Sequence, residues 1–437
     1  MGKSDWKAKA KSLKKKLKAL ATTMRAPKAK PVSPLAPTAF PALPRIAGAE
    51  FAAVAAGVRY QGRRDVMLVR LAPGTQMAGV FTRSSTRAGC IRDAQAKLAL
   101  KAPDGAGAAI VVNSGNSNAF TGRAGEEAVA AVCATAAAAC GLPETRVFMN
   151  STGVIGEPLP HDRIIAVMGD LTAGLAEDGI AWAAEAIMTT DTFPKGAAAT
   201  VAVPGGEVRI AGIAKGSGMI APDMATMLVY IFTDAAIPAG TLQKMLSRNV
   251  GDTFNAITVD SDTSTSDALL LCATGRGPEV KGRGPLAAFE RALKGVMADL
   301  ALQVVRDGEG ATKLIEVRVT GAASPEDAHK VAMAIANSPL VKTAVAGEDP
   351  NWGRIVMAVG KSGAEADRDR LTIRFGDLIV ARDGWRDPAY REEDGAAHMK
   401  GQEIVIGVDL GLGPHARTVW TCDLTHRYID INADYRS

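Results

Sequence analysis

The most informative stretch of the sequence runs from Lys215 to Tyr230 and reads KGSGMIAPDMATMLVY. Its first half begins with a lysine, holds two glycines and ends in a proline turn, which predicts a loop. Residues 226–232 are mostly apolar, and they predict a strand that follows the loop. On residue chemistry alone, the segment is a turn that leads into a buried strand, with Thr226 as the first strand residue.

Segments on both sides of this stretch alternate between strand and helix patterns. A proline and two acids after Ser324 mark a helix start, because the serine can cap the helix and the acids face its positive end. Strands mixed with helices throughout predict an α/β fold, with a mixed α+β arrangement as the variant, in which helices cover mixed sheets. The expected strands are 108–113, 201–203, 226–232, 314–319, 371–375 and 403–408, and the expected helices are 126–139 and 286–305.

Positive charge is concentrated at the beginning of the chain. Residues 1–30 hold eleven Lys and Arg and one acid, whereas the rest of the chain carries 40 basic and 45 acidic residues. We expect a disordered basic tail over 1–30, with a weakly amphipathic helix as the alternative, joined by a proline-rich segment to a mildly acidic body. Nucleic-acid or anionic-membrane contact therefore rests on the tail alone, and we expect neither nucleic acid nor a stable membrane association as the main partner.

Several common kinds of site are missing from the sequence. The five cysteines fit no zinc spacing and are expected to be reduced and mostly buried, and the five histidines show no ligand spacing, so we expect no metal. The stretch that ends in Lys361-Ser362 fails as a phosphate-binding loop, because Ile355 stands where its first glycine should be. No run of 18 apolar residues predicts a membrane span, and we expect a cytoplasmic protein without a cofactor.

The stretch from Lys215 to Tyr230 resembles the self-cleavage site of the ornithine acetyltransferases, the glutamate N-acetyltransferases of arginine biosynthesis. The resemblance runs from about Val32 to Ser437 and rests on several separated motifs. It implies that the chain cuts itself between Ala225 and Thr226, giving an N-terminal chain of residues 31–225 and a C-terminal chain of residues 226–437. It also implies that the freed Thr226 is the catalytic nucleophile.

The chemistry of an N-terminal threonine agrees with this implication. A threonine hydroxyl is too weakly acidic to attack an amide unaided, so it needs an adjacent base. An N-terminal threonine carries such a base in its own α-amino group, whose ordinary pKa of about 7.7–8.0 is close to the working pH. Before cleavage the same nitrogen is an amide without basicity, so cleavage would create the base.

A second motif, Asn150–Gly156, reads NSTGVIG. The resemblance places Thr152 and Gly153 in the oxyanion hole. Glycine permits a close backbone approach, and one oxyanion donor is typically worth about 2.7–4 kcal/mol in the transition state. Taken without the resemblance, the motif favours a Ser/Thr/Gly turn that caps a helix.

Five further residues match the family's substrate-binding positions. A lysine and a glutamate suit an amino-acid ligand, the first pairing with carboxylate and the second with ammonium. Each charge taken alone is also compatible with a surface ion pair. The five residues are Thr192, Lys215, Glu309, Asn432 and Ser437.

Two single residues and three short blocks outside these matches also bear on the resemblance. Two depart from the family pattern: Asp223 stands where the family usually has asparagine, and Arg436 replaces the more usual threonine. Three other blocks match the family without an assigned role, and they are expected to be buried polar turns that shape the site: Asn113–Asn116, Thr258–Thr263 and Gly347–Arg354.

The resemblance implies a ping-pong reaction in which Thr226 takes the acetyl group from N2-acetylornithine and passes it to glutamate. It suggests a heterotetramer of two copies of each cleaved chain. Whether acetyl-CoA also donates acetyl groups is left open by the sequence. The alternative function is a self-cleaving hydrolase or aminopeptidase with an N-terminal nucleophile, which would use water as the acceptor. A binding module based on the basic tail is the alternative from a different class.

Overall fold

The computed structural model describes Lys14, residues 31–221 and residues 227–433. The chain forms two units, Met1–Val32 and Ser33–Ser437, and the second contains all the helices and strands described below, within residues 33–433. The basic tail predicted for residues 1–30 lies outside the described residues apart from Lys14.

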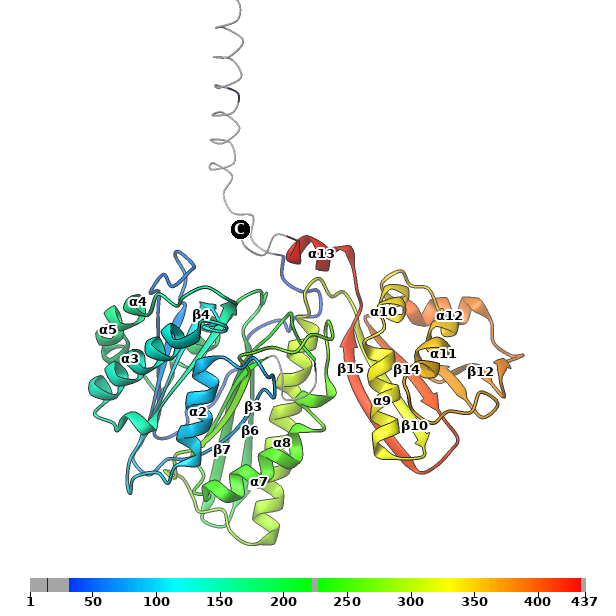
Figure 1. Ribbon diagram of the computed structural model, residues 1–437. Helices are drawn as coiled ribbons and strands as arrows, with labels where there is room; N and C mark the ends of the chain where they lie inside the picture. Colours follow the sequence, from blue (N-terminus) through cyan, green and yellow to red (C-terminus); the bar gives the residue numbers. More distant parts are fainter. Residues whose placement is uncertain (1–13, 15–30, 222–226, 434–437) are drawn as a thin grey trace, which may run out of the picture. The chain divides into compact units, whose positions relative to one another are not determined.

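Three sheets make up the β structure of the second unit (Figure 1). Sheet A has the strand order β1-β2-β4-β5, sheet B has β3-β9-β8-β7-β6, and sheet C has β13-β12-β11-β14-β10-β15. The strands are β1 (Ala49–Val54), β2 (Val66–Leu71), β3 (Gln76–Phe81), β4 (Ala108–Asn116), β5 (Val147–Val154), β6 (Lys195–Val203), β7 (Gly206–Lys215), β8 (Leu228–Thr233), β9 (Ala268–Ala273), β10 (Leu314–Ala322), β11 (Thr372–Phe375), β12 (Leu378–Arg382), β13 (Trp385–Arg386), β14 (Glu403–Asp409) and β15 (His415–Cys422).

Helices connect these strands and cover the sheets. The α-helices are α2 (Gly89–Ala99), α3 (Gly122–Cys140), α4 (His161–Ala166), α5 (Met168–Ala173), α6 (Ile180–Ala186), α7 (Ala239–Val250), α8 (Arg283–Arg306), α9 (Pro325–Ala336), α10 (Pro339–Ala346), α11 (Trp352–Gly360), α12 (Glu392–Met399) and α13 (His426–Asn432). Two short 3-10 turns, η1 (Glu144–Arg146) and η2 (Phe254–Ala256), complete the described elements.

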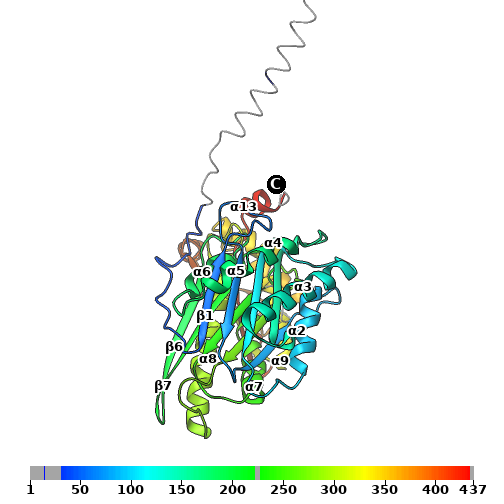
Figure 2. The ribbon, with the colours of Figure 1, turned by 90° about the vertical axis from the view of Figure 1, so that its left-hand side faces the viewer.

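Sheets A and B pack face to face between two layers of helices. One hydrophobic cluster joins both sheets to α3, α5 and α6, and a second joins the other face of sheet B to α7 and α8. Figure 2 shows α3, α4 and α5 on the outer side of sheet A. The order of layers is therefore helix, sheet, sheet, helix.

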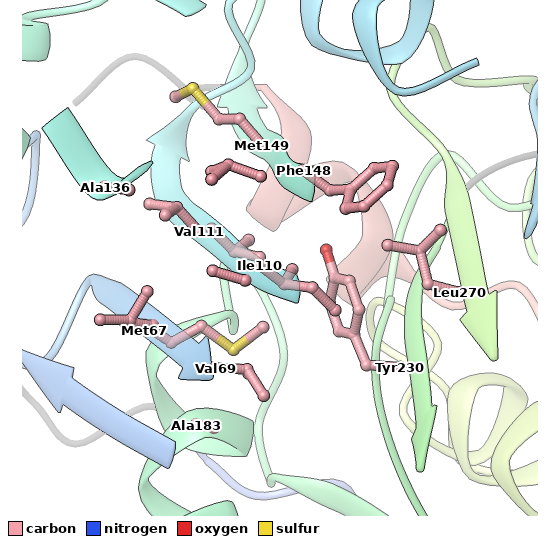
Figure 3. Packing of buried hydrophobic residues seen from close by; sticks show 14 of the residues in the cluster. Met67, Val69, Ile110, Val111, Ala136, Phe148, Met149, Ala183, Tyr230 and Leu270 are labelled. Atoms are coloured by element: carbon pink, nitrogen blue, oxygen red, sulfur yellow. The ribbon is translucent and has the colours of Figure 1, made fainter. Parts of the chain in front are cut away.

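Strand β8 lies at the centre of this arrangement, and both of its faces are buried. Tyr230 and Phe232 point into the cluster between the sheets, whereas Val229 and Ile231 point toward α7 and α8. Successive strand residues face opposite sides of a sheet, so a strand covered on both faces reads as a continuous apolar run. The Tyr230 ring packs among sheet A side chains (Figure 3), and its hydroxyl donates to Asn150 Oδ1 at 3.1 Å.

Sheet C forms its own core with the helices that lie between its strands β10 and β11 in the sequence. Its apolar side chains pack against α9, α10 and α11 in a third hydrophobic cluster. Trp420 on β15 also packs against the cluster of sheet B, which links sheet C to the double-sheet layers.

The fold class and most of the predicted elements are confirmed. Mixed parallel and antiparallel sheets are covered by helices, and each expected strand and helix falls on an observed one. The Ser324 side chain caps α9 by accepting from the Asp327 backbone N–H. The five cysteines are free, four of them buried and Cys140 half-buried. Within the described ranges, no helix combines the length and apolar character needed to cross a membrane.

Candidate active site

A cavity of about 310 Å³ lies where the ends of strands from sheets A and B meet. Its lining is rich in hydroxyl groups and contains three charged side chains, those of Lys215, Asp267 and Glu309. The described lining residues are Ser117, Thr152, Gly153, Val154, Ile155, Thr189, Thr190, Lys215, Gly218, Met219, Met227, Leu228, Ser264, Thr265, Ser266, Asp267, Glu309 and Asn432.

The sheet topology explains why residues so distant in sequence converge here. Strands β4 and β5 are parallel, so their carboxyl ends lie together and bring Ser117 beside Thr152 and Gly153. Strands β8 and β9 are also parallel, and both begin at the cavity. Lys215 ends β7 opposite Leu228, the first residue of β8.

Thr152 and Gly153 end strand β5 and form part of the cavity wall. The next helix, α4, begins only at His161, so the alternative of a helix-capping turn is wrong. Gly153 has φ +130°, and a Cβ there would lie 2.3 Å from the carbonyl carbon of Gly115. Only glycine allows β4 and β5 to approach so closely at this point.

Lys215 and Glu309 bring opposite charges into the cavity, and both residues are buried, with 8% and 7% of their surface exposed. Lys215 Nζ donates to Thr152 Oγ1 at 3.1 Å. Among the described residues, neither side chain forms an ion pair within 4 Å. The alternative of surface ion pairs is therefore wrong for these two residues.

Helix α13 supplies the last predicted residue that the structure describes. Asn432 Nδ2 donates to Glu309 Oε2 at 2.6 Å. Burial raises the pKa of Glu309, although hydrogen bonds from Asn432 and Thr190 oppose the shift. The N-cap residue of α13, Thr425, also contacts the Glu309 loop, because its hydroxyl donates to the Gly310 carbonyl at 2.8 Å.

A fully buried charged network lies beside the cavity. Lys195 Nζ donates to Asp191 Oδ1 at 2.7 Å and to Asp307 Oδ2 at 2.6 Å, and none of the three side chains is exposed. Burial favours a neutral Asp191, but the ammonium groups of Lys195 and Lys215 and the hydrogen bonds it accepts hold its pKa below the usual range. Burial alone would lower the pKa of Lys195, yet the two carboxylates raise it.

This network holds the loops that carry the cavity residues. Asp191 accepts hydrogen bonds from the backbone N–H groups of Thr189 and Gly216, which flank the cavity residues Thr190 and Lys215. The Asp307 carbonyl accepts from the Ser217 hydroxyl at 2.5 Å, and Glu309 N donates to the Ser217 carbonyl at 3.0 Å.

Of the predicted substrate residues within the described ranges, only Thr192 is absent from the cavity lining. Its hydroxyl donates to Asp307 Oδ1 at 2.5 Å and accepts from the Ser33 backbone N–H at 2.9 Å. Thr189 and Thr190, three and two residues earlier, line the cavity instead. The sequence motif located this loop correctly but did not distinguish which threonine faces the cavity.

Several predicted residues lie outside the described residues. The predicted cleavage bond between Ala225 and Thr226 falls in the gap 222–226, together with Asp223. Ser437 and Arg436 fall in the gap 434–437. Met227, which directly follows Thr226 in the chain, lines the cavity.

The unassigned sequence blocks have different places in the structure. The Asn113–Asn116 block is buried as expected, and Asn113 Oδ1 accepts from the Ser151 hydroxyl at 2.7 Å. It forms the end of strand β4, however, so the expectation of a turn is wrong, because these residues pair with β5. The Thr258–Thr263 block contacts the loop before residue 222 through Asp260. Sequence reasoning did not single out Asp260 or Asp267, because an isolated aspartate in a Ser/Thr-rich turn gives no signal by itself.

Opposite charges in one enclosed cavity suit a small ligand that carries both a cationic and an anionic group. Beside them, a threonine hydroxyl and a glycine backbone stand where negative charge on a reacting oxygen could be stabilised, as acyl transfer requires. The fold and the site therefore define a candidate enzyme of acyl-transfer chemistry.

Comparison with known proteins gives the family. A model of the ArgJ family matches residues 50–437. The arginine biosynthesis bifunctional protein ArgJ of Ruegeria pomeroyi is 66% identical over 407 residues, which cover 93% of this chain and 98% of that protein. The protein of the same name from Gluconobacter oxydans is 55% identical over 401 residues, 91% of this chain and 94% of that one. The chain belongs to the ArgJ family.

Two solved structures are also similar. The arginine biosynthesis bifunctional protein ArgJ of Bacillus halodurans shares 43% identity with a TM-score of 0.44, covering 46% of this chain and 96% of that one. The ornithine acetyltransferase of Mycobacterium tuberculosis, solved in complex with ornithine, shares 32% identity with a TM-score of 0.36, covering 40% of this chain and 92% of that one.

Proposed function

We propose that the protein moves an acetyl group from N2-acetylornithine to glutamate through an acetyl ester on Thr226, forming ornithine and N-acetylglutamate. The observation that carries this proposal is the pair of buried, opposite charges, Lys215 and Glu309, in one cavity with Thr152 and Gly153. Membership of the ArgJ family and the names of its relatives support the same reaction.

The charge pair explains why the ligand would be an amino acid. Lys215 would hold the α-carboxylate of the substrate, and Glu309 would hold an ammonium group, with Asn432 orienting the Glu309 carboxylate. Thr190 forms a hydrogen bond with Glu309 and lines the cavity, so we assign to it the substrate contact predicted for Thr192. Thr192 would then have an indirect role, through the hydrogen bond that its hydroxyl donates to Asp307.

Thr152 is suited to the oxyanion hole because of its bond with Lys215. Its hydroxyl oxygen accepts a hydrogen bond from the lysine ammonium, so its own hydrogen is free to point toward a developing oxyanion. Because Gly153 has no side chain, a reacting oxygen could come close to the backbone there, as a second oxyanion donor requires.

Self-cleavage would come first. The Thr226 hydroxyl oxygen adds to the Ala225 carbonyl carbon, the C–N bond breaks, and the hydroxyl proton passes to the departing nitrogen. Water then hydrolyses the resulting ester, leaving a carboxylate on Ala225 and a free hydroxyl and amine on Thr226. The new amine is the base for every later turnover.

Acetyl transfer would follow in two steps. Thr226 Oγ1 attacks the acetyl carbon of N2-acetylornithine, and ornithine leaves after its nitrogen takes the proton held by the Thr226 amine. The amine of glutamate then attacks the acetyl ester, which releases the Thr226 hydroxyl. Both tetrahedral intermediates place negative charge on the same oxygen, next to Thr152 and Gly153.

The remaining parts of the proposal concern the assembled protein. We infer two copies of each cleaved chain, a cytoplasmic location, no resident cofactor, and acetyl-CoA as a second acetyl donor. The printed name of the Ruegeria pomeroyi relative, a bifunctional protein, supports the last of these. Ser437 is retained as a proposed substrate contact.

One assay tests the proposed reaction against the hydrolase alternative. The purified protein is mixed with N2-acetylornithine, with and without glutamate, and both N-acetylglutamate and free acetate are quantified. We expect N-acetylglutamate to form in proportion to ornithine, with little acetate. Equal acetate release in the presence and absence of glutamate would show that water is the acceptor and that the protein is a hydrolase.

A further inference from the structure

Asp260 holds the backbone of the loop that leads toward the predicted cleavage bond. Its carboxylate accepts hydrogen bonds from the N–H groups of Met219, at 2.6 Å, and Ile220, at 2.9 Å. Within the described ranges, this carboxylate forms no ion pair within 4 Å, so the contacts with Met219 and Ile220 are its principal ones with the loop. Ile220 lies five residues before Ala225 in the sequence.

The same loop is held from its carbonyl side. The Ile220 carbonyl accepts from the Val259 N–H at 2.8 Å and from the Thr258 hydroxyl at 3.0 Å, and the Ile220 side chain is fully buried. The three residues Thr258, Val259 and Asp260 therefore bind both backbone polar groups of Ile220, its N–H and its carbonyl. This accounts for the sequence block 258–263 in a way that its composition did not.

Met219, the first of the two residues that Asp260 holds, has an unfavourable backbone conformation. Met219 has φ +57°, in the left-handed region that residues other than glycine rarely adopt. Such a conformation costs about 1–3 kcal/mol and persists only where the surroundings impose it. At Met219, the backbone N–H is held by its hydrogen bond to Asp260.

A further contact connects Asp260 with the C-terminal helix. The Tyr428 hydroxyl, on α13, donates to Asp260 Oδ2 at 3.2 Å. The same helix carries Asn432, which contacts Glu309 in the substrate cavity. The aspartate is thus oriented by an element other than the loop it holds.

We propose that Asp260 is a positioning residue for self-cleavage, which keeps Met219 and Ile220 in the strained backbone path that leads to the Ala225–Thr226 bond. The inference rests on the proposed function, because it presupposes that the chain cuts itself. Asp260 would touch none of the reacting atoms, and the bonds made and broken are those described above. Its effect is on the rate of cutting and not on acetyl transfer by the cut enzyme.

The test follows freshly synthesised full-length chains by intact mass and measures the fraction cut over time. Asp260→Asn preserves the size of the side chain but replaces one acceptor oxygen with an amide group, so one of the two backbone N–H groups loses its partner. We expect the cutting rate to fall at least tenfold. Asp104→Asn, which removes an almost fully exposed charge from the loop before β4, is the matched control and is expected to cut at the wild-type rate.

A rescue variant separates positioning from general damage. Glycine adopts positive φ without strain, so Met219→Gly removes the need for an imposed conformation. We expect the double variant Met219→Gly with Asp260→Asn to cut faster than Asp260→Asn alone. On a logarithmic scale, its cutting rate should regain at least half of the difference from the wild type. Once cut, Asp260→Asn protein should show kcat and KM for acetyl transfer within twofold of the wild type at pH 8, well above the acid limb that Glu309 sets.

The outcomes distinguish this inference from the proposed function. Wild-type protein that never cuts contradicts the proposed function and removes the inference with it. Wild-type protein that cuts, together with a folded Asp260→Asn protein that cuts equally fast, overturns the inference alone, as does a slow variant that glycine does not rescue. If Asp260→Asn fails to fold, Tyr428→Phe takes its place: slower cutting in a folded protein is expected, and wild-type cutting overturns the inference.

Discussion

Glu309 shows how burial sets the chemistry of a single residue. Burial raises the pKa of its carboxyl group, and the nearby Asp260 adds to the shift, while Asn432, Thr190 and Lys215 oppose it. Because the raised pKa favours the neutral form in the folded protein, this group favours folding at low pH and loses that contribution as pH rises through the raised pKa. The ionised form is nevertheless the one that could hold a substrate ammonium group.

A pH prediction follows for catalysis. As pH falls through the raised pKa, Glu309 becomes neutral, so kcat/KM for glutamate should decline at a higher pH than an ordinary glutamate, with a pKa of about 4.3, would allow. Asn432→Ala removes a donor to the carboxylate and should move this acid limb to still higher pH.

Glu309→Gln should lower kcat/KM at pH 8 by roughly 10–100-fold, because a charged hydrogen bond is lost, and it should abolish the acid limb. An acid limb unchanged in both variants would contradict this role.

Gly218 is restricted by the same carboxylate. A Cβ at residue 218 would lie 2.4 Å from Glu309 Cδ, so Gly218→Ala must displace the Glu309 side chain or its own loop. We expect the KM for glutamate to rise about tenfold or more, since a displacement of this size at a charged contact costs on the order of 1.5 kcal/mol. Steady-state kinetics measure the effect.

The control for this substitution is Gly295→Ala. A Cβ at residue 295, within α8, would meet nothing within 4 Å. Replacing a helical glycine with alanine should raise the free energy of unfolding by about 0.5–1 kcal/mol and leave KM unchanged. A normal KM in Gly218→Ala would show that the close approach to Glu309 is without consequence.

At the scale of elements, long periodic segments were predictable and their junctions were not. The apolar stripe of α8 and the cap of α9 depend on residues close together in sequence, and both predictions are confirmed. The choice between Thr190 and Thr192 was not predictable, because it depends on how the loop before β6 is held by Asp191 and Asp307. Those carboxylates lie more than a hundred residues apart in the chain.

Helix α13 is the element whose attachment depends most on single polar contacts. None of its residues is buried, and Asn432, Tyr428 and Thr425 connect its segment to the site. Asn432→Ala should therefore speed amide hydrogen exchange across residues 426–432, because local opening of a segment without buried apolar contacts costs little. Exchange in β8 should be unchanged, and equal protection of α13 in both proteins would contradict this view.

For the molecule as a whole, one buried cation supports the site. Removing Lys195 would leave Asp191 and Asp307 buried without a partner charge. We expect Lys195→Met to lower the free energy of unfolding by about 3–5 kcal/mol in urea titrations. Lys294→Met is the matched control: its pair with Asp252 is about half exposed, so its loss should cost at most about 1 kcal/mol. Similar losses in the two variants would contradict the central place of Lys195.

The sequence indicated the site better than it indicated the network behind it. Thr152, Gly153, Lys215, Glu309 and Asn432 were named from motifs, and all five line one cavity. Each motif had a plausible structural alternative by itself, and agreement among distant motifs decided between them. The ion pairs of Lys195 and the backbone contacts of Asp260 could not be predicted in this way, because neither kind of contact leaves a pattern in one sequence.

The central claim is that the chain cuts itself before Thr226 and uses the freed threonine. Intact-mass measurement of the purified protein, alongside a Thr226→Ala variant, tests it most directly. The wild type should appear as two fragments, the second beginning at Thr226, and the variant should appear as one uncut chain without acetyl transfer. A wild type that remains one active chain, or a Thr226→Ala protein that is cut or active, would contradict the account.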